Sequence, residues 1–180
     1  MTFTETKLKG AYLIDPEPVD DERGSFARTF CRKEFAAHGL HTDWVQSSWS
    51  LNKQRGTLRG LHYQLSPYEE IKLVSCTHGA LYDVIIDLRK DSPTFMQSLG
   101  VKLSGDNRRM LYIPRHFAHG YQTRMEHTEV SYLISEYYHP EYARGIRWDD
   151  PAFGIHWPIP ERILSERDQS FPLWGTNGQP

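Results

Sequence analysis

The stretch Gly56-Thr-Leu-Arg-Gly-Leu-His62-Tyr-Gln-Leu-Ser-Pro-Tyr-Glu-Glu-Ile-Lys72-Leu-Val74 decides the fold. Its alternation of apolar and polar residues predicts two β-strands in a hairpin around a turn at Ser66-Pro67-Tyr68. Side chains alternate between the two faces of a strand, so one face of each strand carries Leu58, Gly60, His62 and Gln64, and then Lys72, Val74 and Cys76. If both faces point inward, a histidine, an amide and a lysine share an apolar pocket. That combination suits proton transfer beside a developing negative charge.

The rest of the chain extends this strand-rich pattern. Strands are predicted at 11–14, 25–30, 44–51, 81–88, 97–103, 110–113 and 129–135, and one short helix at 32–38 ends at Gly39. Ser104-Gly-Asp-Asn107 is expected to form a hairpin turn. Residues 175–180 are expected to form a disordered tail. The pattern predicts an all-β sandwich or barrel with short peripheral helices, in a single domain over residues 1–180.

Composition narrows the class of protein. The formal net charge is −2 and there is no basic block, so binding to nucleic acid or to an acidic membrane surface is not expected. No apolar run approaches the ~20 residues of a membrane helix, and the N-terminal residues have no apolar core of a signal peptide. Cys31 and Cys76 are too few for a disulfide framework, which predicts a cytoplasmic protein.

His62 is the first candidate for chemistry. A lone histidine on a strand is usually structural, but Arg59, Gln64 and Lys72 lie close to it in the sequence and favour a catalytic base. A base needs a group that orients it and stabilises its charged form. The late segment that ends at Asp168 could supply that carboxylate if it folds back onto the strand.

Two further sets of residues allow two interpretations each. Tyr132, between Val130 and Ile134, is either a core tyrosine or a proton donor that faces His62 across the pocket. Three scattered arginines are either surface residues or converge on a diphosphate, whose oxygens match the guanidinium fork: Arg23, Arg59 and Arg167.

A second motif, Ile113-Pro114-Arg-His116-Phe-Ala-His119-Gly120, completes a pattern with Gly56 and His62. The spacing resembles the two short motifs of cupins, which are small double-stranded β-barrels or jelly rolls. His116 stands where the second motif usually has glycine. Many cupins bind a metal through His-x-His, but here the second position is Gln64, a poor ligand for zinc or iron. His119 with Glu69 or Glu70 could still complete a metal site.

The ordered phrases of the chain resemble the dTDP-4-dehydrorhamnose 3,5-epimerases from about Ala11 to Leu173. The matching phrases are Arg23-Gly24-x-Phe26, Val45-Gln46, Lys72-Leu-Val74, Tyr137-Tyr138 and Asp168, with the segments 58–64, 83–89, 92–95, 117–120, 145–151 and 155–158. The resemblance implies a metal-free cupin that needs no cofactor. It also implies a homodimer acting on a nucleotide-diphosphate 4-keto-6-deoxyhexose.

The resemblance also assigns roles to individual residues. It implies that His62 is the base, Asp168 its partner, Tyr132 the acid on the opposite face and Lys72 the group beside the 4-keto oxygen. Contacts with the sugar and the diphosphate are implied for Arg23, Gln46, Arg59, His119 and Arg167, and stacking on the base for Tyr138. The N-terminal strands within residues 1–30 are expected at the dimer interface, where Arg23 and Phe26 reach the partner's pocket.

Three positions depart from the family pattern. Arg28 and Ala143 stand where the family usually has a glutamate, and Ser47-Ser48 replaces Asp-Asn after Gln46. One hypothesis is that the reaction class is kept while the preferred nucleotide or sugar differs, for example a CDP- or GDP-linked substrate. The other is drift that neighbouring residues compensate.

Three alternatives remain for the function. An enzyme of the same class could invert only C3 or only C5, because both centres can use one base. A non-catalytic nucleotide-sugar-binding cupin would not need His62, Lys72, Tyr132 and Asp168 together. A metal-dependent cupin isomerase or oxygenase would contain a bound metal.

Overall fold

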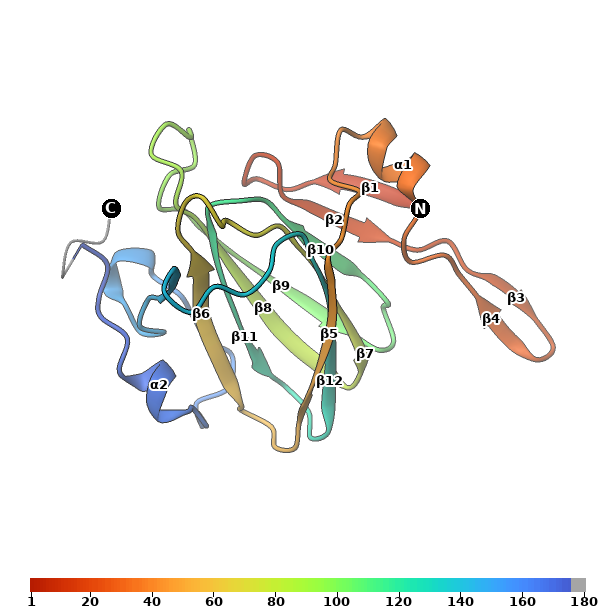
Figure 1. Ribbon diagram of the computed structural model, residues 1–180. Helices are drawn as coiled ribbons and strands as arrows, with labels where there is room; N and C mark the ends of the chain where they lie inside the picture. The colour runs from red at the N-terminus through yellow and green to blue at the C-terminus, as the bar shows by residue number, and fades with distance from the viewer. Residues whose placement is uncertain (176–180) are drawn as a thin grey trace.

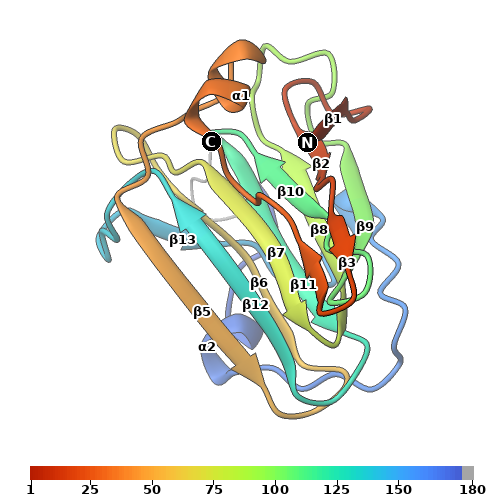
Figure 2. The ribbon, with the colours of Figure 1, turned by 90° about the vertical axis from the view of Figure 1, so that its right-hand side faces the viewer.

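A computed structural model describes residues 1–175 of the chain, and all of the tail predicted at 175–180 except Gly175 lies outside them. Two antiparallel sheets face each other (Figures 1 and 2). The six-stranded sheet has the order β1 (Thr2–Glu5), β2 (Tyr12–Asp15), β10 (Met110–Ile113), β7 (Lys72–His78), β12 (Thr128–Ile134) and β5 (Gln46–Asn52). The five-stranded sheet has the order β13 (Ala143–Gly145), β6 (Leu58–Gln64), β11 (Phe117–Thr123), β8 (Ala80–Asp87) and β9 (Ser98–Ser104). The predicted all-β jelly roll is confirmed.

Helices are few and peripheral. They are α1 (Arg32–Ala37), the 3₁₀ turn η1 (Pro151–Phe153) and α2 (Glu166–Gln169). The predicted helix at 32–38 is confirmed, and Gly39 follows it with a φ of +68°. Among residues 1–175 no helix has the length and apolar character needed to cross a membrane.

The central stretch forms the two predicted strands, but the prediction that they pair as a hairpin is wrong. β6 belongs to the five-stranded sheet and β7 to the six-stranded sheet, so the turn between them carries the chain across the barrel. The same correction applies to β9 and β10, which flank the turn at 104–107 and lie in different sheets. Turn residues mark where a chain reverses, and they do not say which strand it will meet.

The alternation within β6 is interrupted at Gly60. Leu58 packs on the outer side of the five-stranded sheet with Leu61, so the predicted shared face of Leu58 and His62 is wrong. Gly60 has a φ of +108°, and a Cβ there would lie 2.6 Å from the Cα of Gly120 on β11. Glycine is needed for this close approach. The interruption brings Arg59 to the cavity side together with His62.

The core between the sheets holds the inward faces that the alternation of β7 and β12 predicts. Val74, Cys76 and Val130 are fully or almost fully buried in it, and Tyr132 packs against them. A second apolar cluster covers the outer side of the five-stranded sheet under the C-terminal segment, with Ile146 and Trp157 as members. That segment ends with α2, which contacts β6. The outer cluster therefore fixes where the carboxylate of Asp168 is presented.

Among residues 1–175, one pair of strands stands apart from the barrel, and it lies in the N-terminal region. β3 (Val19–Asp21) and β4 (Gly24–Phe26) form a two-stranded ribbon that projects away from the two sheets (Figure 1). The predicted strand at 25–30 is confirmed only as far as Phe26. Val19 and Phe26 are exposed on this ribbon. The rest of the N-terminal region adds β1 and β2 to the edge of the six-stranded sheet.

Candidate active site

A cavity of about 330 Å³ opens between the two sheets. Strands from both sheets border it. Eight of the predicted site residues line it: His62, Lys72, Tyr132, Ser48, Arg59, His119, Tyr138 and Arg167. The volume is near the lower end of the range for sites that bind small molecules.

His62 lines the cavity wall and is hydrogen bonded to Asp168 behind it. His62 Nε2 lies 2.7 Å from Asp168 Oδ1, and Asp168 is almost completely buried. Ser165 accepts a hydrogen bond from the Asp168 backbone N–H and caps α2, which orients the carboxylate. Burial raises the pKa of Asp168, but hydrogen bonds from His62, the Gly60 N–H and Ser165 outweigh it and lower the pKa. The carboxylate therefore accepts a hydrogen bond from Nε2–H, which leaves Nδ1 of His62 available as a base.

Tyr132 borders the same cavity from the opposite sheet. Its hydroxyl lies 3.3 Å from Ser50 Oγ, which in turn lies 3.0 Å from the hydroxyl of Tyr121. Burial raises the pKa of Tyr132 well above its usual value, and the neighbouring Tyr121 adds to the shift. The phenol therefore stays protonated at neutral pH and can donate a proton.

Lys72 has a partner that the sequence did not single out for this role. Lys72 Nζ lies 2.6 Å from Glu70 Oε1, and both side chains are largely buried at the cavity. The carboxylate holds the ammonium in one place and supports its charge. The sequence indicates Glu70 only as an acid that could complete a metal site.

Two further cavity residues are held by buried partners. His119 Nε2 lies 2.9 Å from Asp83 Oδ1 and 3.1 Å from Asp83 Oδ2. Arg59 Nε donates to Asn52 Oδ1 at 2.8 Å, and Tyr121 donates to the same oxygen. Asp83 and Asn52 were not predicted as site residues from the sequence. The signal for Asp83 was an acid in an otherwise apolar strand, which is costly unless a partner satisfies it.

Arg167 and Tyr138 lie together at the mouth of the cavity. Arg167 Nη1 donates to the Tyr138 hydroxyl at 3.5 Å, and the guanidinium carbon lies 5.8 Å from the ring centre of Phe171. Tyr138 is exposed, so one face of its ring is available for stacking. Phe171 also packs edge-on against the ring of His62.

Five predicted site residues do not line the cavity of their own chain, and one of them, Asp168, lies behind His62. Arg23 and Phe26 lie on the projecting ribbon, where Arg23 pairs with Asp21. Arg28 is exposed and forms an ion pair with Glu34 at 3.2 Å. Gln46 begins β5, two residues before Ser48 on the same strand. Of the three departures from the family pattern, Ser48 and Ala143 therefore face the cavity, whereas Arg28 does not.

Each histidine of the cavity lining is paired with one aspartate, and Glu70 is paired with Lys72. No group of three or more histidine, cysteine, aspartate or glutamate side chains within residues 1–175 is arranged to hold a metal ion. Glu69, one of the two acids considered for a metal site, lies 3.4 Å from His116 instead.

A family model and a curated relative both match the chain over most of its length. A family model described as dTDP-4-dehydrorhamnose 3,5-epimerase matches residues 5–175. A protein of that name from Methanothermobacter thermautotrophicus is 44% identical over 172 residues, which cover 94% of this chain and 92% of the relative.

Solved structures agree with the sequence matches. The dTDP-4-dehydrorhamnose 3,5-epimerase of Bacillus anthracis, solved with TDP and PPi bound, has a TM-score of 0.93 and 42% identity, covering 96% of this chain and 98% of that one. A dTDP-6-deoxy-D-glucose-3,5-epimerase of Legionella pneumophila, in complex with dTDP-4-keto-L-rhamnose, has a TM-score of 0.90 and 39% identity, covering 96% and 92%. The chain shares the fold of both proteins.

Proposed function

The chain belongs to the dTDP-4-dehydrorhamnose 3,5-epimerase family and is an isomerase, and on this premise we propose how its residues epimerise a nucleotide-linked 4-keto-6-deoxyhexose. One observation carries the proposal. His62, backed by Asp168, and the neutral phenol of Tyr132 border one cavity from opposite sheets, with Lys72 beside them.

The reaction begins with proton removal. C3 and C5 of the sugar both neighbour the C4 ketone, so their protons are acidic. Nδ1 of His62 takes a proton from one of these carbons, and the ring becomes an imidazolium that Asp168 stabilises. Such a general base typically contributes about 10²- to 10⁴-fold to the rate.

The electron pair left behind moves onto the C4 oxygen and forms an enolate. The ammonium of Lys72, held by Glu70, is the positive group that stabilises this oxygen. A preorganised donor of this kind is typically worth ~2.7–4 kcal/mol in the transition state. No redox cofactor takes part, because only protons move.

The inverted centre forms when the enolate carbon takes a proton from the other face. Tyr132 supplies it, and its oxygen becomes a phenolate while the C4 ketone is restored. The raised pKa of Tyr132 keeps the phenol protonated until the enolate forms and favours the return of a proton from solvent to the phenolate afterwards. His62 loses its extra proton to solvent, and the enzyme is ready for the second centre.

The substrate's other parts are assigned to the cavity mouth and to a second subunit. Arg59 and Arg167 bind the diphosphate, Tyr138 stacks on the base, and Gln46 and His119 contact the sugar or nucleotide. The exposed ribbon of β3 and β4 suits a homodimer in which Arg23 and Phe26 enter the partner's cavity. Both cysteines are free, which fits the reducing cytoplasm, and we place the enzyme there.

We assign dTDP as the nucleotide, because the relatives' names specify it. Ser48 and Ala143 are smaller than the residues usual in the family and leave an altered cavity wall. A thermal-shift titration with dTDP, CDP, GDP and UDP tests the assignment. The largest shift is expected with dTDP, and a clear preference for another nucleotide would show that these two positions changed specificity.

Deuterium exchange tests the reaction itself. The full-length protein is incubated in heavy water with a dTDP-4-keto-6-deoxyhexose, and incorporation at C3 and C5 is followed by NMR. Exchange at both carbons is expected. Exchange at one carbon would identify a monoepimerase, and exchange at neither carbon with any nucleotide 4-keto sugar would refute the enzymatic proposal.

A further inference from the structure

A second cavity, of about 810 Å³, lies where the loops that follow β6, β8 and β10 meet the turn at Lys9 and the side chain of Trp174. It is larger than the reaction cavity, and Tyr63 and Gln64 border both. None of His62, Lys72 and Tyr132 lines it. Its volume is typical of sites for small molecules.

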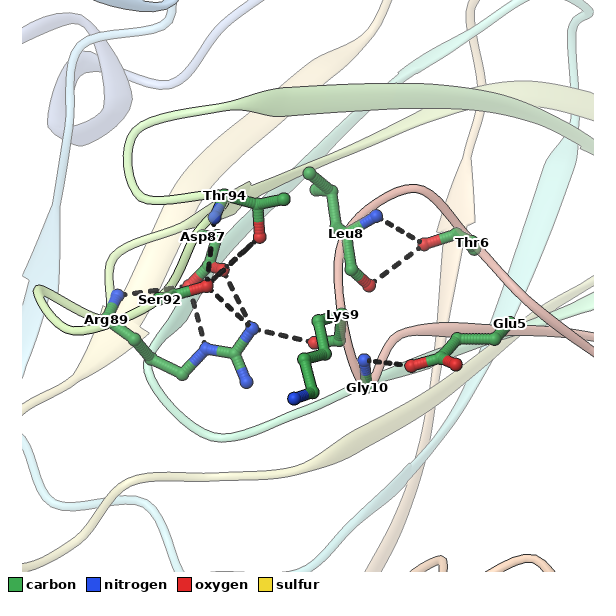
Figure 3. A network of polar contacts seen from close by, with 9 residues as sticks. All are labelled: Glu5, Thr6, Leu8, Lys9, Gly10, Asp87, Arg89, Ser92 and Thr94. Carbon is green, nitrogen blue, oxygen red and sulfur yellow. Dashed lines mark hydrogen bonds and ion pairs between the residues drawn. The ribbon is translucent and has the colours of Figure 1, made fainter.

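Arg89 is fixed at the wall of this second cavity. Its Nε donates to Asp87 Oδ1 at 2.8 Å, and its Nη2 donates to Asp87 Oδ2 and to the Lys9 carbonyl, both at 2.7 Å. The guanidinium also lies 4.8 Å over the ring of Phe117. Figure 3 shows that the third guanidinium nitrogen, Nη1, makes none of these bonds and lies on the same side as the ammonium of Lys9. Arg89 therefore keeps one donor in a fixed position without a protein acceptor among residues 1–175.

Asp87 keeps this arrangement charged. It is fully buried and also accepts hydrogen bonds from Ser92 Oγ at 2.5 Å and Thr94 Oγ1 at 2.7 Å (Figure 3). Burial raises the pKa of Asp87, but the bonds from Arg89, Ser92 and Thr94 outweigh it and lower the pKa to about 2. The carboxylate is saturated by these donors, so it holds Arg89 without drawing other cations to it.

The rim of the second cavity carries more positive than negative groups. Lys9 and Lys90 are exposed and form no ion pair within the described part of the chain, and Asp91 is the unpaired acid of the lining. His116 pairs with Glu69 at 3.4 Å. His116 has a φ of +61°, at the position where cupin motifs usually have glycine. A histidine kept in that backbone conformation adds a ring nitrogen to the rim.

The interior of the second cavity supplies an apolar surface. Leu65, Leu88 and Trp174 line it, and Trp174 offers a flat ring.

We propose that the second cavity binds a phosphorylated small molecule with a flat apolar body, the chemistry of a nucleotide, separately from the reaction cavity. Arg89, Lys9 and Lys90 hold the phosphate, and Trp174 packs on the flat body. The site does not depend on the epimerase mechanism, because it shares none of the residues assigned to proton transfer.

Calorimetric titration of the full-length protein with dTDP tests the site. Two binding events per chain are expected. The double variant Lys9→Glu/Lys90→Glu should weaken one event by about tenfold or more and leave turnover unchanged. The matched control Lys33→Glu/Lys102→Glu makes the same charge change at exposed positions away from the cavity and should keep both events. Arg59→Ala should weaken the other event.

The outcomes separate this site from the reaction cavity. A single event per chain, or two events that the Lys9→Glu/Lys90→Glu variant leaves unchanged, would overturn the proposal even if the enzyme is fully active. Pyrophosphate, which has no flat apolar part, tests whether that part of the ligand contributes to binding. It should bind the second site about tenfold more weakly than dTDP, and Trp174→Ala should remove that difference. Equal affinity for pyrophosphate and dTDP in the unmodified protein would refute a site for a nucleotide.

Discussion

Two histidine–aspartate pairs lie next to each other in this molecule, and they differ in access. His62 on β6 and His119 on β11 are register partners on adjacent strands, and both border the reaction cavity. The side chain of His62 is 40% exposed and that of Asp168 is 7% exposed. The corresponding values for His119 and Asp83 are 5% and 0%.

This difference in exposure indicates that access of the substrate to the imidazole, rather than the presence of a histidine–aspartate pair, decides whether the histidine transfers protons. Asp168 comes from the C-terminal segment and approaches His62 from one side, which leaves the other ring nitrogen open to a substrate. Asp83 comes from the neighbouring strand β8 and meets His119 inside the sheet. We therefore assign proton transfer to His62. His119 has a supporting role, in which at most one edge of its ring faces the substrate.

The largest effect is expected for His62→Asn. Asparagine has no basic nitrogen, so deuterium exchange at C3 and C5 should fall by about 10⁴-fold, while dTDP binding stays within a few-fold of the unmodified protein. NMR exchange and calorimetry measure the two quantities. Asp168 keeps its hydrogen bonds from the Gly60 N–H and Ser165 in this variant, so the thermal unfolding temperature should fall less than for His119→Asn. A variant that keeps exchange within about tenfold would remove His62 from the mechanism.

The opposite pattern is expected for His119→Asn. Removing one member of a buried pair leaves the charge of Asp83 without its partner, which typically costs about 3–5 kcal/mol of stability. Denaturant unfolding measures the loss, and exchange per folded molecule should fall by less than for His62→Asn. If the two variants lose the same activity and the same stability, the distinction drawn from access is wrong.

The residues around His62 could be predicted in part from the sequence. His62, Lys72 and Tyr132 could be placed on inward faces because alternation has a period of two, although the interruption at Gly60 moved Leu58 outward. Asp168 follows no periodicity, since it sits in a four-residue helix after an irregular segment. The sequence offered it only as a carboxylate that could fold back onto the strand, and the family resemblance indicated the pairing with His62.

The His119–Asp83 pair could not be predicted from the sequence, for a physical reason. The partner of a buried acid depends on which strands become neighbours, and the sequence pattern wrongly paired β6 with β7. Asp83 contacts His119, and Asn52 contacts Arg59, only because of the strand neighbours that the folded chain adopts. The same limit applies to Glu70, whose contact with Lys72 depends on how the chain crosses the barrel.

Lys72→Met extends the comparison to the six-stranded side of the cavity. Methionine keeps the length of the side chain but removes the positive charge beside the enolate oxygen, so kcat should fall by about 10²- to 10³-fold. Glu70→Gln is the matched control, because the amide oxygen can still accept a hydrogen bond from Lys72. Its kcat should fall less than that of Lys72→Met. An equal loss in both variants would assign Glu70 a direct part in the chemistry.

A third buried aspartate, Asp87, gives the smallest effect and tests what a pair without histidine contributes. Its partners are Arg89 and two hydroxyls, and its pKa is lowered from 3.8 to about 2. A carboxyl whose pKa is lower in the folded state stabilises the fold above its unfolded pKa, and the contribution disappears as the pH falls through the folded value. The pH-dependent part of the stabilisation by Asp87 is therefore about 2 kcal/mol, present above about pH 4 and lost toward pH 2.

The unfolding free energies of the unmodified protein and of Asp87→Asn, measured from pH 7 down to acid, should converge over that interval. Curves that stay parallel would show that Asp87 is not held as an anion, and the fixed position of Arg89 at the second cavity would lose its support.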